Sequence, residues 1–112
     1  MTDKIVILST CANEEEAERL ARALLDAHLA ACVSIVPKVR SFYRWKRKVE
    51  DSAECLLLIK SARPLLARLC AALEKTHSYE VPEIVAMQIV DGSTNYLNWL
   101  QENLLQENPG DE

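Results

Sequence analysis

Three side chains in this sequence have the chemistry to bind a copper or zinc ion. Cys11, His77 and Glu83 supply a thiol, an imidazole and a carboxylate. Thiolate and imidazole favour those two metals, and a carboxylate can supplement them. Their spacing matches no metal-binding signature, because the three residues are scattered along the chain. They form one site only if the fold brings their connecting segments to the same end of a sheet.

Each of these residues also has a purely structural interpretation. His77 can be a loop residue that hydrogen-bonds to backbone, and Glu83, beside Pro82, can be a cap or an interface charge. Cysteines in a reducing compartment are most often small buried hydrophobic residues. Cys11 fits this less well, because it lies where a strand is expected to end. The interpretation suits the three cysteines inside apolar segments: Cys32, Cys55 and Cys70.

The N-terminal third of the sequence predicts a strand followed by a helix. Residues 5–8 are an apolar run too short for a helix, which predicts a strand over 4–8 and a turn over 9–13. Asn13 and Glu16 then have the spacing of a capping box. Glutamates in the first turn also favour the positive end of the helix dipole, so this acidic run is interpreted as a solvated, well-capped helix start.

A long hairpin is predicted from Cys32 to Lys60. Pro37 in its first strand indicates an edge or a bulge, and the turn at 46–48 has no glycine, which predicts a longer loop rather than a two-residue turn. The first strand, 32–45, would span about 46 Å. A compact domain of this length is only about 34 Å across. One end of the hairpin must therefore protrude or bend.

The hairpin end carries half of the aromatic residues of the chain. If it protruded alone, it would expose an apolar patch and open strand edges, and pairing with another copy would cover both. The hairpin therefore predicts a homo-oligomer. The residues concerned are Phe42, Tyr43 and Trp45.

The remaining elements complete a recognisable order. Pro64 opens a second helix, residues 83–90 form a last core strand, and Ser93 caps a third helix. The order β-α-β-β-α-β with an added C-terminal helix predicts an α+β, ferredoxin-like fold, with a four-stranded antiparallel sheet and two helices on one face. Residues 1–105 are expected to form one domain, with 106–112 as a flexible tail.

Composition and charge argue against several classes of partner. The net charge of −4 gives no general attraction to phosphate backbones, and the basic run at 46–48 is followed at once by acidic residues, so no nucleic-acid partner is expected. No apolar run is long enough to span a bilayer, so no membrane association is expected. The N-terminus lacks a basic leader, and residues 5–8 are too short for a signal peptide. A cytoplasmic location is expected.

Four segments, in register along residues 5–104, resemble the CutA family of divalent-cation tolerance proteins. They are Leu-Ala-Ala-Cys-Val at 29–33, Ser-Phe-Tyr-Arg-Trp at 41–45, His-Ser-Tyr-Glu-Val-Pro-Glu-Ile at 77–84 and Gly-Ser-Thr-Asn-Tyr-Leu-Asn-Trp-Leu at 92–100. The resemblance implies a ferredoxin-like homotrimer in which the Cys32 to Lys60 hairpins pair between subunits. It also implies a link to copper or other divalent cations, with a binding or regulatory role rather than catalysis.

The sequence departs from the family pattern at the proposed copper site. Ser9 stands where some members have a cysteine, and Thr76 stands at the position of their histidine. Only Glu83 falls where the pattern expects it, so Cys11 and His77 would be displaced substitutes. Arg47 also replaces the glycine that the family usually has in the hairpin turn.

Three other functions compete with this one. An acylphosphatase shares the predicted topology, but residues 9–13 contain neither the arginine nor the glycine that its phosphate loop needs, and no other catalytic motif is present, so an enzyme is not expected. A sensor similar to PII proteins would bind a small ligand in clefts between subunits. A scaffold trimer would present a protein partner through surface contacts. Fold alone does not choose between these last two.

Overall fold

The chain folds as one antiparallel sheet with two helices on one face. The computed structural model describes residues 2–106. The elements are β1 (Lys4–Cys11), α1 (Glu14–Asp26), β2 (Cys32–Trp45), β3 (Lys48–Ala62), a 3-10 turn (Arg63–Leu65), α2 (Leu66–Thr76), β4 (Val85–Gln88) and α3 (Thr94–Glu102). The strand order is β2-β3-β1-β4, and every neighbouring pair is antiparallel. The predicted ferredoxin-like α+β fold is confirmed.

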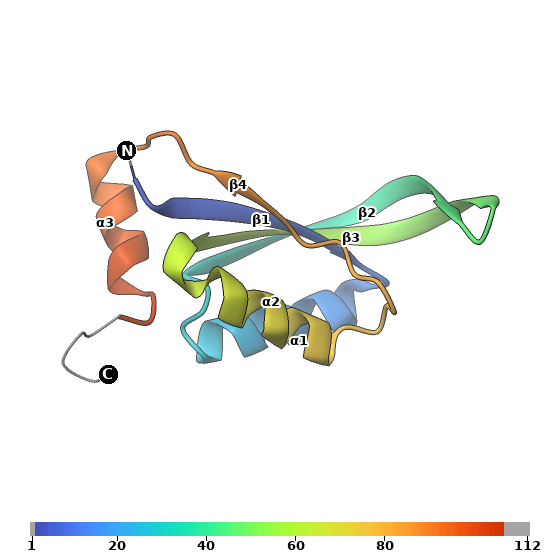
Figure 1. Cartoon of the computed structure of the whole chain (residues 1–112), viewed down its shortest axis with the longest axis horizontal. Coiled ribbons are helices and arrows are strands. Elements are labelled where there is room, and N and C mark those ends of the chain that lie inside the picture. The colour runs from blue at the N-terminus through green and yellow to red at the C-terminus, as the bar shows by residue number, and fades with distance from the viewer. Residues whose placement is uncertain (1, 107–112) are drawn as a thin grey trace.

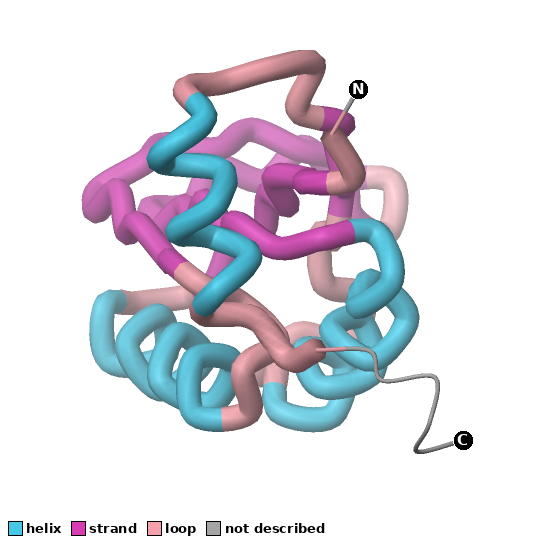
Figure 2. The backbone as a smooth tube through the Cα atoms, turned by 90° about the vertical axis from the view of Figure 1, so that its left-hand side faces the viewer, coloured by secondary structure: helices cyan, strands magenta, loops and turns pink. Residues whose placement is uncertain are grey.

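Helices α1 and α2 form a layer on one face of the sheet, and α3 lies at one end of the sheet. Figure 1 shows α1 and α2 on the same side of the sheet, with α3 at the end opposite the hairpin tip. Figure 2 shows the sheet above these two helices, with α3 across the near end. Ser93 caps α3 as predicted, because its hydroxyl accepts a hydrogen bond from the amide of Tyr96 at 3.2 Å. None of the helices in residues 2–106 is long and apolar enough to cross a membrane.

The core lies between the sheet and the helices. Alternate residues of β1 and β3 point toward the helices, and the predicted apolar stripes of α1 and α2 meet them. Fully buried side chains from both layers include Ile7, Leu57, Ile59, Leu20, Leu24, Leu69 and Leu73.

β1 is longer than the sequence predicted. It continues to Cys11, which lies opposite Cys55 of β3, and Ser9 lies opposite Leu57. The prediction of a turn over 9–13 was wrong, because Ser9 and Cys11 continue the buried alternation and extend the ladder. Only two residues then separate β1 from α1. The second of them, Asn13, accepts a hydrogen bond from the amide of Glu16 at 2.8 Å, as the capping pattern predicted.

The hairpin turn also differs from the prediction. Trp45 pairs with Lys48, so the turn has two residues, Lys46 and Arg47, with φ of 50° and 69°. The prediction of a longer loop was wrong, because both residues adopt the left-handed backbone conformation that glycine usually adopts in such turns. The bulge expected near Pro37 is present, since the β2–β3 register shifts between Val36 and Val39.

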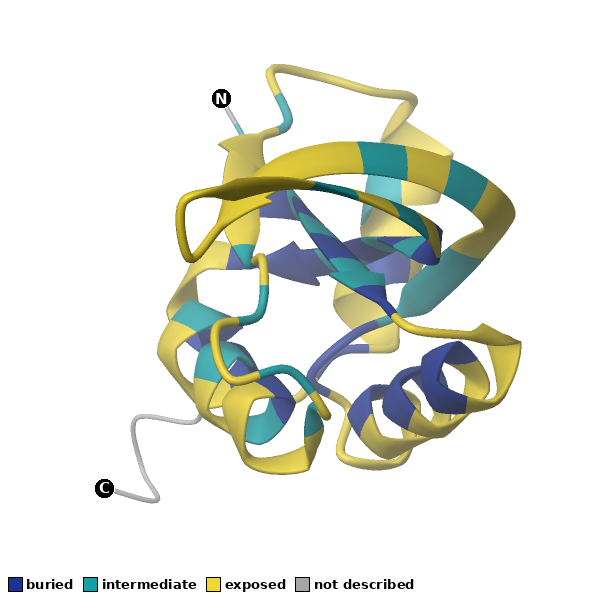
Figure 3. Ribbon diagram, turned by 90° about the vertical axis from the view of Figure 1, so that its right-hand side faces the viewer, coloured by how far each residue is buried: buried dark blue, intermediate teal, exposed yellow. Residues whose placement is uncertain are grey.

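The distal half of the hairpin extends beyond the core. The molecule measures 49 × 30 × 24 Å, and Figure 1 shows the β2–β3 hairpin projecting past the helices. Figure 3 shows this part of the ribbon as largely exposed. Phe42 is 62% exposed, Tyr43 42% and Trp45 39%. The predicted protrusion is therefore confirmed for the single chain.

The last strand is shorter than predicted. β4 covers Val85–Gln88 rather than 83–90, because its ladder pairs only with Ile5–Leu8 of β1. Residues 83–84 instead belong to the segment that joins α2 to β4. Of the expected tail, residues 107–112 lie outside the described residues.

Candidate functional site

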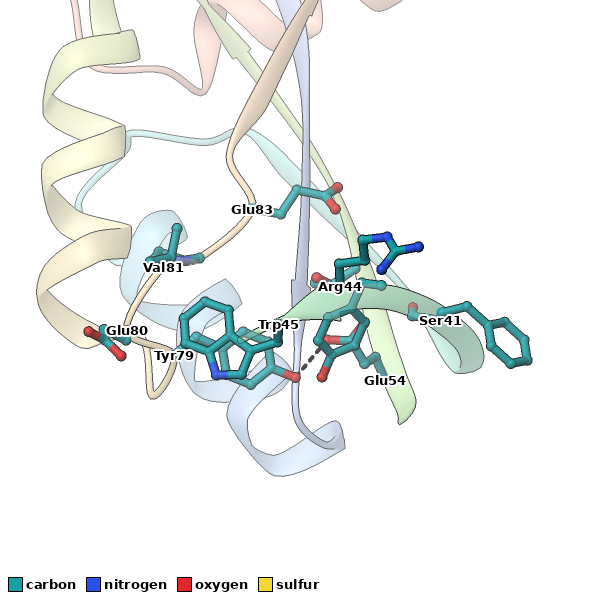
Figure 4. A pocket seen from close by; sticks show the side chains of 12 residues that line it. Ser41, Arg44, Trp45, Glu54, Tyr79, Glu80, Val81 and Glu83 are labelled. Atoms are coloured by element: carbon teal, nitrogen blue, oxygen red, sulfur yellow. Dashed lines mark hydrogen bonds between the residues drawn. The ribbon is translucent and has the colours of Figure 1, made fainter. Parts of the chain in front are cut away.

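A cavity lies where the hairpin faces the segment between α2 and β4. Its volume is about 790 Å³ (Figure 4). β2 contributes residues 41–45, the connecting segment contributes residues 79–83, and Thr10 and Glu54 come from the central strands. Because side chains alternate along a strand, Ser41, Tyr43 and Trp45 share one face of β2. The cavity therefore joins the exposed distal half of β2 to a loop more than thirty residues away.

Tyr79 and Glu54 connect the two walls of this cavity. The Tyr79 hydroxyl donates a 2.6 Å hydrogen bond to Oε2 of Glu54, drawn as a dashed line in Figure 4. Burial and this bond to a carboxylate raise the pKa of Tyr79 well above its ordinary value, so the phenol stays protonated. Glu54 is only 6% exposed, and among residues 2–106 its Oε1 receives no hydrogen bond.

Cys11 is held as a neutral, buried thiol. Its Sγ donates to the carbonyl of Asn13 at 3.5 Å, and the side chain is fully buried. Burial, followed by the negative charge of Glu16, raises the Cys11 pKa to about 11. Metals bind the thiolate, so this environment opposes metal binding at neutral pH.

His77 uses both ring nitrogens in hydrogen bonds to backbone. Nδ1 accepts from the amide of Tyr79 at 3.0 Å, so the proton lies on Nε2, which donates to the carbonyl of Thr10 at 2.8 Å. The side chain is completely buried. It therefore has no free nitrogen for a metal or a proton transfer, and it fixes the segment after α2 to the end of β1.

Glu16 is the structural centre of this end of the sheet, and sequence reasoning missed it. Its carboxylate accepts from the amide of Ala12 at 3.1 Å and from the amide and hydroxyl of Ser78 at 2.7 and 2.9 Å. Burial alone would raise its pKa, but these hydrogen bonds from Ala12 and Ser78 outweigh burial and lower the pKa. The interpretation of the acidic run as solvated therefore does not hold for Glu16. Its capping spacing was the available signal, but the contact with Ser78 is long-range.

The three predicted ligands are not gathered into one cluster. Glu83 is exposed and lines the cavity, whereas Cys11 and His77 do not line it. In the part of the chain from 2 to 106, no group of three or more His, Cys, Asp or Glu side chains is placed to hold a metal ion. Ser9, where the resemblance placed a cysteine, is buried, and its hydroxyl has no hydrogen-bond partner among these residues.

Comparison with known proteins assigns the family. A family model described as CutA1 divalent ion tolerance protein matches residues 5–103. The chain belongs to the CutA1 family. This confirms the resemblance that the four sequence segments indicated.

Individual CutA relatives agree in sequence and fold. The divalent-cation tolerance protein CutA of Thermus thermophilus is 45% identical over 98 residues, which cover 88% of this chain and 95% of the relative. The chloroplastic protein CutA of Arabidopsis thaliana is 41% identical over 99 residues, or 88% of this chain. This chain spans only 54% of that longer relative. The crystal structure of CutA1 from Oryza sativa superposes with a TM-score of 0.90 at 40% identity, covering 93% of this chain and 95% of the other.

Proposed function

We propose that this CutA1-family chain acts in divalent-cation tolerance as a cytoplasmic homotrimer with a binding or regulatory role, and not as an enzyme. The projecting hairpin from Cys32 to Lys60 supports this proposal most directly. β2 is an edge strand, and its distal half carries three aromatic side chains that stay exposed in the single chain. Pairing with neighbouring copies would satisfy the open edge and cover Phe42, the most exposed of these side chains.

The hydrogen bonds of His77 support a role without catalysis. Of the two histidines in the chain, His77 has both nitrogens occupied by backbone groups. His28 is exposed at the end of α1, where Nδ1 lies 3.4 Å from the carbonyl of Asn103. Neither histidine is paired with a serine or cysteine nucleophile in the described residues, as nucleophilic catalysis would require.

For the cation itself, we propose copper or another divalent metal with Glu83 as its first ligand. Glu83 is exposed and can bind without giving up an internal contact. Cys11 and His77 remain in the proposed ligand set, but each would have to exchange a hydrogen bond to a backbone carbonyl for the metal. This difference predicts that Glu83 dominates the affinity.

Metal titration with reduced thiols tests this proposal. Saturating Zn²⁺ or Cu²⁺ should raise the melting temperature, since a ligand of the folded state stabilises it by about 2.7 kcal/mol at 100 times its Kd. Glu83→Ala should remove most of the shift, whereas Glu102→Ala, at the end of α3, should keep it. No shift at saturating metal would exclude metal binding. A shift that Glu83→Ala leaves intact would exclude Glu83 as the first ligand.

Light scattering tests the assembly independently of the metal. The expected mass is three times the 12.6 kDa of one chain. A single-chain mass at micromolar concentration would contradict the homotrimer and leave the metal result unaffected.

A further candidate, a sensor of a small ligand, is favoured by one observation. The cavity beside Tyr79 has about 790 Å³, within the range of small-molecule sites. Thermal stabilisation by a small organic ligand in the presence of chelator would support this role, because the chelator removes any metal contribution.

A further inference from the structure

We propose that the cavity between β2 and residues 79–83 binds an organic cation carrying an alkylated ammonium group. This proposal deepens the sensor candidate by naming a ligand class, and it rests on that candidate rather than on metal binding. Three properties of the cavity support this ligand: its aromatic walls, its charge, and a buried carboxylate without a counter-ion.

Aromatic rings line the cavity from both sides. Tyr43 and Trp45 come from one face of β2, and Tyr79 comes from the connecting segment. Figure 4 labels Trp45 and Tyr79. The faces of such rings carry partial negative charge and attract ammonium groups, most strongly when water is excluded. The ammonium of Lys46 already lies 5.9 Å from the centre of the Trp45 ring, so this ring attracts a cation within its own chain.

The charge of the wall selects a cation over an anion. Three carboxylates line the cavity, from Glu54, Glu80 and Glu83, against the single guanidinium of Arg44. An anionic ligand would be repelled by this excess.

Glu54 supplies the observation that points most directly to a ligand. The residue is only 6% exposed, and its carboxylate forms no ion pair within the described residues. The hydrogen bond from Tyr79 compensates only one oxygen, whereas a buried charge normally has a counter-ion. Because Glu54 lines the cavity, an ammonium group held between the rings would provide the missing positive charge. Alkyl groups on that nitrogen would contact the ring faces.

The binding test uses choline and benzyltrimethylammonium, with 3,3-dimethylbutan-1-ol as the neutral analogue of choline. The chain has two tryptophans, so Trp99→Phe leaves Trp45 as the only one, and its fluorescence reports on the cavity. Titrations are made in chelator, on protein whose mass is checked by light scattering. Both cations should change the fluorescence saturably, and choline should bind about ten times more tightly than its neutral analogue.

Variants that remove a negative or a positive charge from the cavity wall separate the effect of charge on binding from the effect of cavity shape. In the Trp99→Phe background, Glu54→Gln should weaken choline binding about tenfold, and Arg44→Gln should strengthen it severalfold, because it removes the only positive charge of the wall. Glu18→Gln, exposed on α1, is the matched control and should change nothing. If Glu54→Gln fails to fold, Glu83→Gln replaces it, because that side chain is exposed.

Three outcomes would overturn the proposal. One is the absence of saturable binding by either cation, and another is equal binding of choline and its neutral analogue. The third is insensitivity of binding to both Glu54→Gln, or its replacement, and Arg44→Gln. Each is distinguishable from failure of the proposed metal function, because no metal is present. If a variant loses both choline binding and the trimer mass, the test rests on the Arg44→Gln variant. Stronger choline binding by a trimeric Arg44→Gln protein supports the proposed cavity site, and unchanged binding contradicts it.

Discussion

At the scale of single residues, Glu16 connects three segments that meet at the end of β1. Its carboxylate joins the start of α1 to Ala12 and to Ser78 after α2. His77, which packs beside it, ties the same segment to Thr10. Together they position Tyr79, whose amide donates to His77 and whose hydroxyl reaches Glu54. The cavity wall therefore depends on a charge that never contacts the cavity.

The position of Glu16 makes stability depend on pH. Because its folded pKa lies below its ordinary value of 4.5, its contribution is present above pH 4.5 and is lost as the pH falls through the folded pKa. Glu16→Gln should therefore lower the free energy of unfolding by about 2 kcal/mol at pH 7, the value of hydrogen bonds to a charged group. The difference from the parent protein should shrink below pH 4.5. Urea unfolding at several pH values measures both effects.

An exposed glutamate of the same helix controls for general charge effects. Glu18 forms a 3.1 Å ion pair with Arg22 on the surface of α1, so Glu18→Gln should cost less than about 0.5 kcal/mol. Equal losses for the two variants, or a Glu16→Gln loss that grows in acid, would contradict the assigned role of Glu16.

At the scale of elements, the backbone of the hairpin turn is set by the pairing of β2 with β3 and not by the residue preferences of two-residue turns. β2 and β3 stay in register to Trp45 and Lys48, and the long ladder holds Lys46 and Arg47 in left-handed backbone. This conformation costs roughly 1–2 kcal/mol for each residue with a side chain. The ladder must supply that energy.

Relieving this strain should stabilise the protein. The double substitution Lys46→Asn and Arg47→Gly supplies the pair that two-residue turns favour, and should raise the free energy of unfolding by about 1 kcal/mol. Lys48→Gly, one residue on and within β3, should instead lower it by about 1 kcal/mol, because glycine weakens a strand. Chemical denaturation compares them. If the double variant is no more stable than the parent, the turn is not strained in the way its φ angles indicate.

The helices, the order of the strands and the bulge at Pro37 could be predicted because each has a local signal. Apolar spacing, capping residues and proline act within a few positions of the chain. The two-residue hairpin turn could not be predicted, because the pairing of β2 with β3 imposes the backbone conformation of its residues. The candidate site was predicted least well. Cys11 and His77 have the right chemistry, but contacts with Asn13 and Thr10 carbonyls, which no spacing reveals, occupy them.

At the scale of the whole molecule, the folded body and the projecting hairpin differ in how far their apolar side chains are buried. The body has its own core between the sheet and two helices, but the distal hairpin contributes little to it and keeps three aromatic side chains exposed. Two faces of β2 are involved. Tyr43 and Trp45 line the cavity from one face, and Phe42, which also lines it, lies on the opposite face beneath the guanidinium of Arg40, 4.9 Å from its ring centre.

Phe42→Glu should convert the proposed homotrimer into single chains. Phe42 is the most exposed of the three hairpin aromatics, so any interface that covers this position would have to remove water from the new charge, which costs more than a local ion pair returns. Within one chain the new carboxylate can pair with Arg40 or Arg44 on the same strand face, so the fold should persist. Light scattering should show a mass of one chain, and the melting temperature should stop rising with protein concentration. Leu25→Glu, an equally drastic change on an exposed position of α1, should remain trimeric; a trimer that survives Phe42→Glu would mean that this face of the hairpin stays in solvent.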